Sequence, residues 1–243
     1  DDLSESQRHA LAGQISGIDF TLIQKLIEEW VVGTPDVQPF SSIEPASVYA
    51  PYDADDPACA EAVEVGEKAL RDGRVGFVLV AGGQGTRLGF DGPKGSYPAG
   101  PITGRTLFHY FADRIQAISR RYHVQPPWYI MVGDQNEAST RDFFAEHHHF
   151  GIDPGRIHFF KQDMMPCVDE QGHFLLEEKG KLATNPNGHG GVIPAFVRSG
   201  LLDDAKSRGV DTIHYFQVDN YAIRLGDPYF ICLHVQNDAE FSA

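Results

Sequence analysis

A glycine-rich segment that also carries positive charge is the part of this sequence best suited to chemistry. Residues 77–81 are apolar, and the next four residues contain three glycines. Glycine has no Cβ, so successive backbone N–H groups can converge on an anion. Arg87 and Lys94 follow on the same segment, where two cations can neutralise charge that shifts during a reaction. The segment therefore predicts a phosphate-binding loop.

The spacing within this segment excludes two well-known nucleotide-binding loops. No Gly-Lys-Ser/Thr sequence closes it, as a Walker A loop requires. Gly83, Gly85 and Gly89 form the pattern G-x-G-x-x-x-G, which is one residue longer than the dinucleotide-binding fingerprint. A plain glycine-rich turn between a strand and a helix is the alternative, and the ordered series that ends in Arg87 and Lys94 argues against it.

Two other polar positions could take part in nucleotide chemistry. Asp219 follows a predicted strand at 212–218, where a carboxylate can hold Mg²⁺ against phosphate oxygens or simply cap a turn. Gln162 follows residues 156–161, and its side-chain amide offers both the donor and the acceptor that the edge of a nucleotide base requires. The alternative is an ordinary surface glutamine, which has the same groups. The three histidines at 147–149 point about 100° apart on a helix and so do not converge on one metal ion.

Apolar periodicity predicts the elements that position these residues. Strands and helices alternate after residue 74, which indicates an α/β fold with a mostly parallel sheet and helices on both faces. Ligands bind beyond the carboxyl ends of the strands in such a sheet, where residues 82–89 would lie. The expected strands are residues 75–81, 128–132, 156–161, 174–176 and 212–218, and residues 229–235 form a strand or begin a helix. The expected helices are residues 106–122, 137–147, 191–199 and 201–208.

The N-terminal region differs in composition from the rest of the chain. Helical spacing of apolar residues predicts two helices within residues 4–32. Residues 33–58 contain five prolines, which indicates an extended connector, and residues 60–72 form a short acidic helix. We therefore expect two parts, an N-terminal region of helices and connector at residues 1–58 and a nucleotide-binding domain at residues 59–243.

The charge of the chain is acidic overall but positive near the glycine-rich segment. The 243 residues carry a formal net charge of −14, which argues against general binding to nucleic acids or anionic membranes. Residues 1–73 hold 15 acidic and 4 basic side chains, whereas residues 74–121 hold 2 acidic and 7 basic ones. This basic region coincides with the predicted phosphate loop, although chance clustering on a surface helix would give the same count.

Further features predict a cytoplasmic protein, which we expect to be a monomer. No apolar segment approaches the length that spans a membrane, and no cleavable signal pattern is visible. Cys59, Cys167 and Cys232 show no paired spacing and are expected to be reduced thiols.

Several motifs occur in the order found in one known family. The glycine-rich motif reads LVAGGQGTRLG at residues 79–89 and is followed by Pro93-Lys94. Together, over about residues 70–235, the motifs resemble the eukaryotic-type UDP-sugar pyrophosphorylases, and most of all the UDP-N-acetylglucosamine pyrophosphorylases. The later motifs are FFKQDMMP at 159–166, PNGHGG at 186–191, VDN at 218–220 and Asp227-Pro228.

The resemblance implies a fold and an activity. The fold would be a three-layer, Rossmann-like sheet of the nucleotidyltransferase (GT-A-like) type with an N-terminal helical extension. The activity would be uridylyl transfer with Mg²⁺, which forms a UDP-sugar and pyrophosphate from UTP and a sugar 1-phosphate, with N-acetylglucosamine 1-phosphate favoured. The alternatives are a UDP-glucose or broad-specificity pyrophosphorylase and a non-catalytic uridine-nucleotide-binding module. A scaffold domain whose acidic helices bind a protein is a rival of another class.

The resemblance also implies roles for individual residues. Arg87 and Lys94 would be the catalytic cations, Asp219 the Mg²⁺ ligand, and Gln162 the contact to uracil. The expected nucleotide-binding residues are Ala81, Gly82, Gly83, Gln84, Gly85, Thr86, Gln162, Pro186, Gly188 and His189.

This chain departs from the pattern of the N-acetylglucosamine enzymes, which reads Pro-Asp-Gly-Asn-Gly-Gly. Asn187 and His189 replace its Asp and its Asn, and the resulting Gly-His-Gly is similar to the UDP-glucose pyrophosphorylases, which leaves the acceptor sugar open. Members of the family are also longer, and their later residues supply sugar contacts, a second metal-binding Asp and a further catalytic Lys. We therefore expect a fragment that holds the nucleotide-binding part and has weak or no turnover alone.

Overall fold

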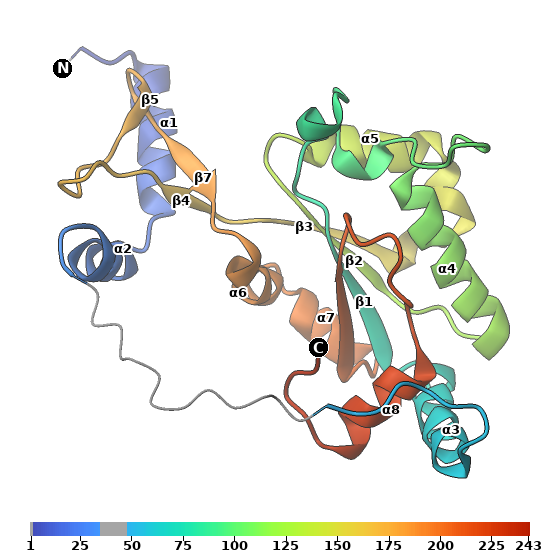
Figure 1. The fold of residues 1–243 in the computed structure, drawn as a ribbon. Helices are drawn as coiled ribbons and strands as arrows, with labels where there is room; N and C mark the ends of the chain where they lie inside the picture. The colour runs from blue at the N-terminus through green and yellow to red at the C-terminus, as the bar shows by residue number, and fades with distance from the viewer. Residues whose placement is uncertain (1, 35–47) are drawn as a thin grey trace. The chain divides into compact units, whose positions relative to one another are not determined.

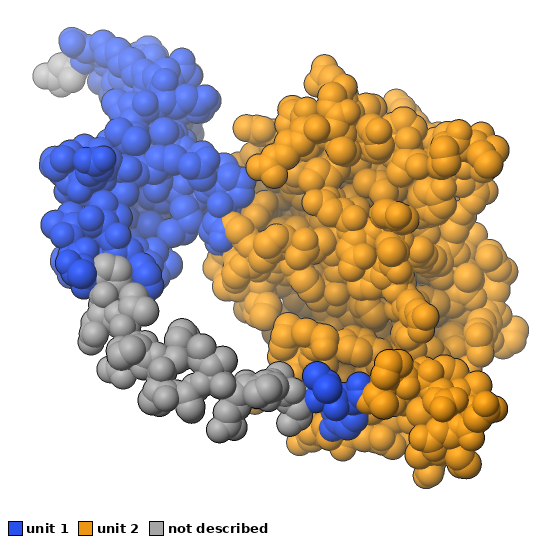
Figure 2. Space-filling model, in the orientation of Figure 1, with its two compact units in different colours: residues 1–49, 163–187 blue, residues 50–162, 188–243 orange. Residues whose placement is uncertain are grey.

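The computed structural model describes residues 2–34 and 48–243. These residues form two compact units, which are coloured separately in Figure 2. Part of the connector expected at residues 33–58 lies outside the described residues. Unit 1 is residues 1–49 and 163–187, and unit 2 is residues 50–162 and 188–243.

Unit 1 combines the N-terminal helices with a segment from the middle of the chain. Gln14 in the first helix exchanges two hydrogen bonds with the backbone of Leu182, one accepted at 3.0 Å and one donated at 3.3 Å. The prediction of two helices within residues 4–32 is confirmed. The helices are α1 (Glu5–Ser16) and α2 (Phe20–Leu26), which continues into one π-helical turn, η1 (Ile27–Val31). The antiparallel pairs are β4 (Met164–Pro166) with β7 (Thr184–Pro186), and β5 (Leu176–Glu178) with β6 (Lys181–Leu182).

The centre of unit 2 is a four-stranded parallel sheet in the order β3-β2-β1-β8 (Figure 1). From β1, the chain adds β2 and β3 on one side and later adds β8 on the other, so the strand order reverses between β1 and β8. Open α/β sheets bind ligands at the carboxyl ends of strands next to such a reversal. The strands are β1 (Val75–Val80), β2 (Trp128–Val132), β3 (Ile157–Lys161) and β8 (Thr212–Gln217).

Helices cover both faces of this sheet, and the predicted three-layer α/β fold is confirmed. Residues 229–235 belong to a helix rather than a strand, because Asp227 accepts from the Tyr229 N–H and Pro228 occupies the first helical turn. One face is covered by α3 (Pro57–Arg71), α4 (Leu107–Tyr122), α5 (Glu137–Glu146) and α8 (Pro228–Gln236). The other face is covered by α6 (Val192–Arg198) and α7 (Leu201–Ser207).

The two central strands are buried along their whole length. In β1, Phe77 and Leu79 pack toward α4, whereas Val78 and Val80 pack toward α6 and α7. Burial on both faces is why this strand reads as an unbroken apolar segment. None of the helices in residues 2–34 and 48–243 is long and apolar enough to cross a membrane.

Candidate functional site

The loop after β1 folds back on itself beside the carboxyl ends of β2 and β3. The Lys94 N–H donates to the Gly83 carbonyl at 3.1 Å, and the Gly85 N–H donates to the Gly92 carbonyl at 2.9 Å. A Cβ added to Gly82 would lie 2.6 Å from the Gln162 side-chain oxygen. A larger residue at position 82 would therefore push the Gln162 amide out of its present place.

Not every amide of this loop is available to a ligand. The Gly85 N–H is engaged within the loop, so a phosphate would have to use other donors. Within the described residues, the N–H groups of Gly82, Gly83, Gln84 and Thr86 have no acceptor. Unpaired backbone donors that lie close together are the means by which such loops bind anions.

A buried asparagine from the segment after β2 holds the start of this loop. Asn136 is 0% exposed, and its Nδ2 donates to the carbonyls of Ala81 at 2.9 Å and Gly83 at 3.2 Å. Its Oδ1 accepts from the Gly133 N–H at 2.8 Å. Sequence analysis missed Asn136, because an asparagine before a helix resembles an ordinary cap. The available signal was a polar residue soon after a fully apolar strand.

The predicted cation Lys94 and the predicted metal ligand Asp219 meet at the reversal of strand order. Lys94 Nζ lies 3.0 Å from Asp219 Oδ2, although the two residues are 125 positions apart. Lys94 is largely covered, with 21% of its side chain exposed, and Asp219 is 58% exposed. Arg87 is exposed on the short helix η2 (Thr86–Leu88) and has no acidic partner in the described part of the chain.

A second group of predicted residues gathers beyond β3. The Gln162 N–H donates to the Val132 carbonyl at 2.8 Å, and its side-chain amide donates to the Gly188 carbonyl at 3.3 Å. Gly188 has φ 72° and ψ −162°, a conformation essentially restricted to glycine. His189 follows at the start of the short helix η6 (His189–Gly191), and its Nδ1 lies 2.9 Å from Tyr215 Oη.

The structure thus brings together Gln162, Gly188 and His189, whereas Pro186 belongs to β7 in unit 1. Tyr215 is a further residue that sequence analysis missed, because its contact to His189 exists only in three dimensions.

Another cation near the strand ends is neutralised locally. Lys161 Nζ lies 3.2 Å from Asp134 and 3.0 Å from Glu137. The hydrogen bond to Glu137 raises the pKa of Lys161, and the same bond lowers the pKa of Glu137. Arg87 is therefore a cation of this region whose charge is still free to meet a ligand.

A magnesium ion fits the residues present. Among the described residues, no three His, Cys, Asp or Glu side chains gather to hold a metal. Mg²⁺ needs only one or two carboxylates when substrate phosphates supply other ligands. Asp219 offers such a carboxylate, since it is well exposed and lies next to the phosphate-binding candidate Lys94.

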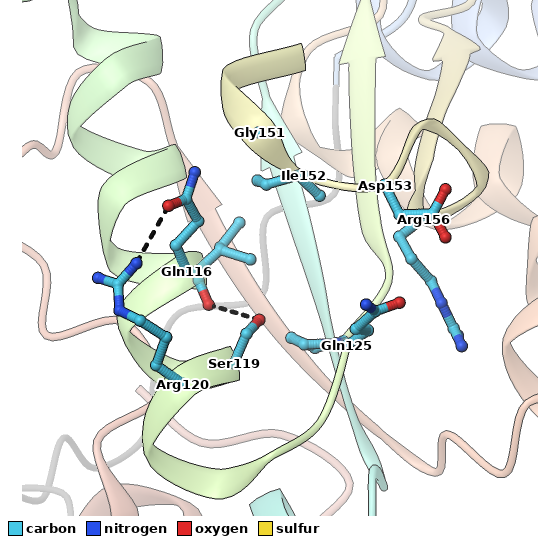
Figure 3. A pocket seen from close by; sticks show the side chains of 10 residues that line it. Gln116, Ser119, Arg120, Gln125, Gly151, Ile152, Asp153 and Arg156 are labelled. Atoms are coloured by element: carbon cyan, nitrogen blue, oxygen red, sulfur yellow. Dashed lines mark hydrogen bonds between the residues drawn. The ribbon is translucent and has the colours of Figure 1, made fainter. Parts of the chain in front are cut away.

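A hollow elsewhere in unit 2 is separate from these residues. It has a volume of about 250 Å³ and lies between α4 and the segment that precedes β3 (Figure 3). Arg120 donates to the Gln116 side chain at 3.1 Å at its edge, and Arg156 extends from the opposite side. None of the predicted nucleotide-binding residues lines this hollow, so we place the candidate site at the carboxyl ends of the strands.

Comparison with known proteins identifies the family of this chain and several relatives. The family described as UTP–glucose-1-phosphate uridylyltransferase matches residues 45–243. UDP-N-acetylglucosamine diphosphorylase 2 of Arabidopsis thaliana is 33% identical over 257 aligned residues, covering 100% of this chain and 51% of that protein. UDP-N-acetylglucosamine pyrophosphorylase of Saccharomyces cerevisiae is 36% identical, covering 73% of this chain and 38% of that protein.

A solved structure shares the fold over nearly the whole chain. The Trypanosoma brucei uridine diphosphate N-acetylglucosamine pyrophosphorylase, crystallised with an inhibitor, has a TM-score of 0.76 and 26% sequence identity. The match covers 97% of this chain and 50% of the trypanosome chain. The chain therefore spans about half the length of the Arabidopsis and trypanosome proteins.

Proposed function

Because the chain belongs to the UTP–glucose-1-phosphate uridylyltransferase family, we propose that it is the nucleotide-binding part of a sugar uridylyltransferase. In the proposed reaction, a phosphate oxygen of a sugar 1-phosphate forms a bond to the α-phosphorus of UTP. The bond from that phosphorus to pyrophosphate breaks, which leaves a UDP-sugar and pyrophosphate. No covalent enzyme intermediate is required, so catalysis rests on alignment and charge neutralisation.

The meeting of Lys94 and Asp219 is the observation that carries this proposal. Two residues far apart in sequence place a cation and a carboxylate 3.0 Å apart, where the strand order reverses. Nucleotides bind at such positions in open α/β sheets. A surface ion pair elsewhere would carry no such meaning. Here it lies beside a loop with several unpaired N–H groups.

The proposed roles follow from this arrangement. The unpaired amides at residues 82–84 and Thr86 hold phosphate oxygens, and Arg87 and Lys94 stabilise negative charge that develops on the leaving pyrophosphate. Mg²⁺, when bound at Asp219, would neutralise further phosphate charge. Ala81 directly follows β1 and is buried, and Asn136 holds its carbonyl, so both position the loop.

The far end of the nucleotide is assigned to the second group of residues. Gln162 would contact uracil through its amide, and Gly188 and His189 would face the base and the ribose or sugar. The names of the plant and yeast relatives favour N-acetylglucosamine 1-phosphate as the acceptor, and the Gly-His-Gly sequence keeps glucose 1-phosphate as the competitor.

Binding of UTP tests the proposal directly. Isothermal titration of the chain with UTP and Mg²⁺ should give saturable binding, and Arg87→Ala should weaken it at least tenfold, because a charge-assisted hydrogen bond contributes about 1.5–3 kcal/mol. Arg120→Ala removes a comparable exposed arginine outside the site and should leave the affinity unchanged. Absence of saturable UTP binding to the unaltered chain would contradict the proposal.

Turnover and the choice of sugar need the longer protein. In a chain extended to the length of its relatives, a pyrophosphate-release assay with UTP should respond to N-acetylglucosamine 1-phosphate more strongly than to glucose 1-phosphate. Arg87→Ala should lower that turnover by about two orders of magnitude, as the loss of one transition-state hydrogen-bond donor does elsewhere. Binding without turnover of either sugar phosphate would indicate a non-catalytic uridine-nucleotide-binding module.

A further inference from the structure

The outer strand β8 directs two polar side chains toward the side of the sheet that holds α6. His214 and Phe216 point into the core beside α4 and α8, so the residues between and after them, Tyr215 and Gln217, point the other way. On that side, Tyr215 Oη lies 2.9 Å from Nδ1 of His189.

The chemistry of the phenol and the imidazole indicates which atom holds the shared proton. Burial raises the pKa of Tyr215, so the hydroxyl is protonated at neutral pH and has one proton to donate. A phenol O–H is a more acidic donor than a neutral imidazole N–H, and an unprotonated imidazole nitrogen is a stronger acceptor than a phenol oxygen. The 2.9 Å contact is therefore best satisfied when Tyr215 donates its hydroxyl proton to His189 Nδ1.

We propose that Tyr215 is a positioning residue that holds neutral His189 in the tautomer with Nε2 protonated, and that this Nε2–H donates a hydrogen bond to an oxygen of the bound uridine nucleotide or its sugar. The inference rests on the proposed function for the ligand, but the tautomer itself does not. A neutral imidazole whose Nδ1 accepts a hydrogen bond must carry its proton on Nε2.

The surroundings of His189 support a fixed donor rather than a freely rotating surface side chain. The backbone just before it is held by the Gln162 amide, which donates to the Gly188 carbonyl at 3.3 Å. Its ring is held by Tyr215. His189 is otherwise exposed, so the rest of the ring is open to a ligand. An N–H donor at this place selects acceptor oxygens, which hydroxyl and phosphate groups supply.

Nuclear magnetic resonance tests the tautomer without any ligand. Long-range ¹H–¹⁵N spectra at neutral pH should show His189 Nε2 protonated and Nδ1 unprotonated, with the signals identified by their loss in His189→Gln. In Tyr215→Phe, which removes only the hydroxyl, the two nitrogen signals should move toward the values of a mixed population. A His189 that carries its proton on Nδ1 in the unaltered chain would overturn the inference.

Titration with UTP–Mg²⁺ and with UDP-N-acetylglucosamine tests the role of this donor. Tyr215→Phe should weaken binding of at least one ligand about fivefold, the size expected for one hydrogen bond. It should have no further effect in a His189→Ala background. Tyr52→Phe, which keeps the ring packed against Tyr229 and lies away from His189, should bind as the unaltered chain does.

The outcomes separate the two proposals. If the unaltered chain binds uridine nucleotides and Tyr215→Phe binds them equally well, this inference is wrong while the proposed function stands. An equal loss in Tyr215→Phe with and without His189→Ala would show that Tyr215 acts independently of His189 and would also overturn it. If the unaltered chain binds neither ligand, the proposed function fails and the ligand contact fails with it.

Discussion

The central and the outer strands of the sheet contribute to the candidate site in different ways. Every residue of β1 and β2 is buried, and their contributions come from the segments that follow them, which hold the glycine-rich loop and Asn136. In β8, buried His214 and Phe216 alternate with Ile213 and Tyr215, which are 38% and 37% exposed. The outer strand β8 therefore carries a residue of the candidate site, Tyr215, within the strand itself. The central strands carry site residues only in the segments that follow them.

The difference follows from how much of each strand is buried. A strand buried on both faces must be apolar or have its polar atoms paired, as Asp204 pairs the Tyr129 hydroxyl of β2, since a buried polar side chain without a partner costs stability. A strand at the side of the described sheet has one partly open face and can carry polar groups there. In β8 this is the face of Tyr215 and Gln217, whereas His214 lies on the opposite, buried face.

The first prediction compares how much side-chain packing in β1 and in β8 contributes to stability. Phe77→Ala in β1 removes a side chain that is 0% exposed, and we expect the free energy of unfolding to fall by about 3–5 kcal/mol. Ile213→Ala in β8 truncates a partly exposed side chain and should cost less than about 1.5 kcal/mol. Urea unfolding of both variants measures the contrast, and equal losses would show that β8 is packed as tightly as β1.

The same comparison explains how much the sequence could predict. The apolar pattern of unit 2 predicted all four strands of the main sheet within one or two residues. The pattern is clearest for β1 and β2, because these strands are buried on both faces. The strands β4, β6 and β7 were not predicted. They are two or three residues long, and they are defined by hydrogen bonding to a partner strand rather than by an apolar pattern in the sequence.

The site was predictable to the extent that residue type alone reveals it. The glycines and cations of the loop stand out in the sequence, and the structure brings Lys94 and Asp219 together. Asn136 and Tyr215 could not be found this way, because their importance depends on partners that are distant in sequence. Nor could the sequence show that the Gly85 amide is already engaged by Gly92.

A second prediction addresses the segments that follow the central strands. Asn136→Ala leaves the Gly133 N–H and the Ala81 carbonyl without this partner and removes one of the two donors to the Gly83 carbonyl, and we expect a loss of about 3 kcal/mol in unfolding free energy. UTP affinity should also fall, because the loop loses its anchor. Calorimetric melting and titration with UTP–Mg²⁺ measure the two effects.

Two further variants make this test specific. Asn136→Asp should be no better than alanine, since a carboxylate would face two carbonyl oxygens. Asn237→Ala removes an exposed asparagine at the end of α8 and should alter neither measurement. A chain with Asp at position 136 that binds UTP normally would show that the donated hydrogen bonds do not shape the loop.

The outer strand should respond to acid because of His214. Burial among aromatic rings lowers the pKa of His214 to about 4, and Asp227 opposes this shift only in part. The unfolded chain takes up a proton at this position below about pH 6.5, whereas the folded chain does not until about pH 4. The free energy of unfolding therefore falls as the pH drops from 6.5 toward 4.

We expect His214 to account for a loss of about 2 kcal/mol between pH 7 and pH 5, since each pKa unit corresponds to about 1.4 kcal/mol. In His214→Leu, which keeps a similar volume, urea unfolding at the two pH values should differ by about 2 kcal/mol less than in the unaltered chain. His123→Asn, at an exposed position with a left-handed backbone that asparagine tolerates, should keep the original pH dependence. If His214→Leu also keeps it, then water or a carboxylate reaches His214 in the folded chain, and the inward face of β8 is less sealed than that of β1.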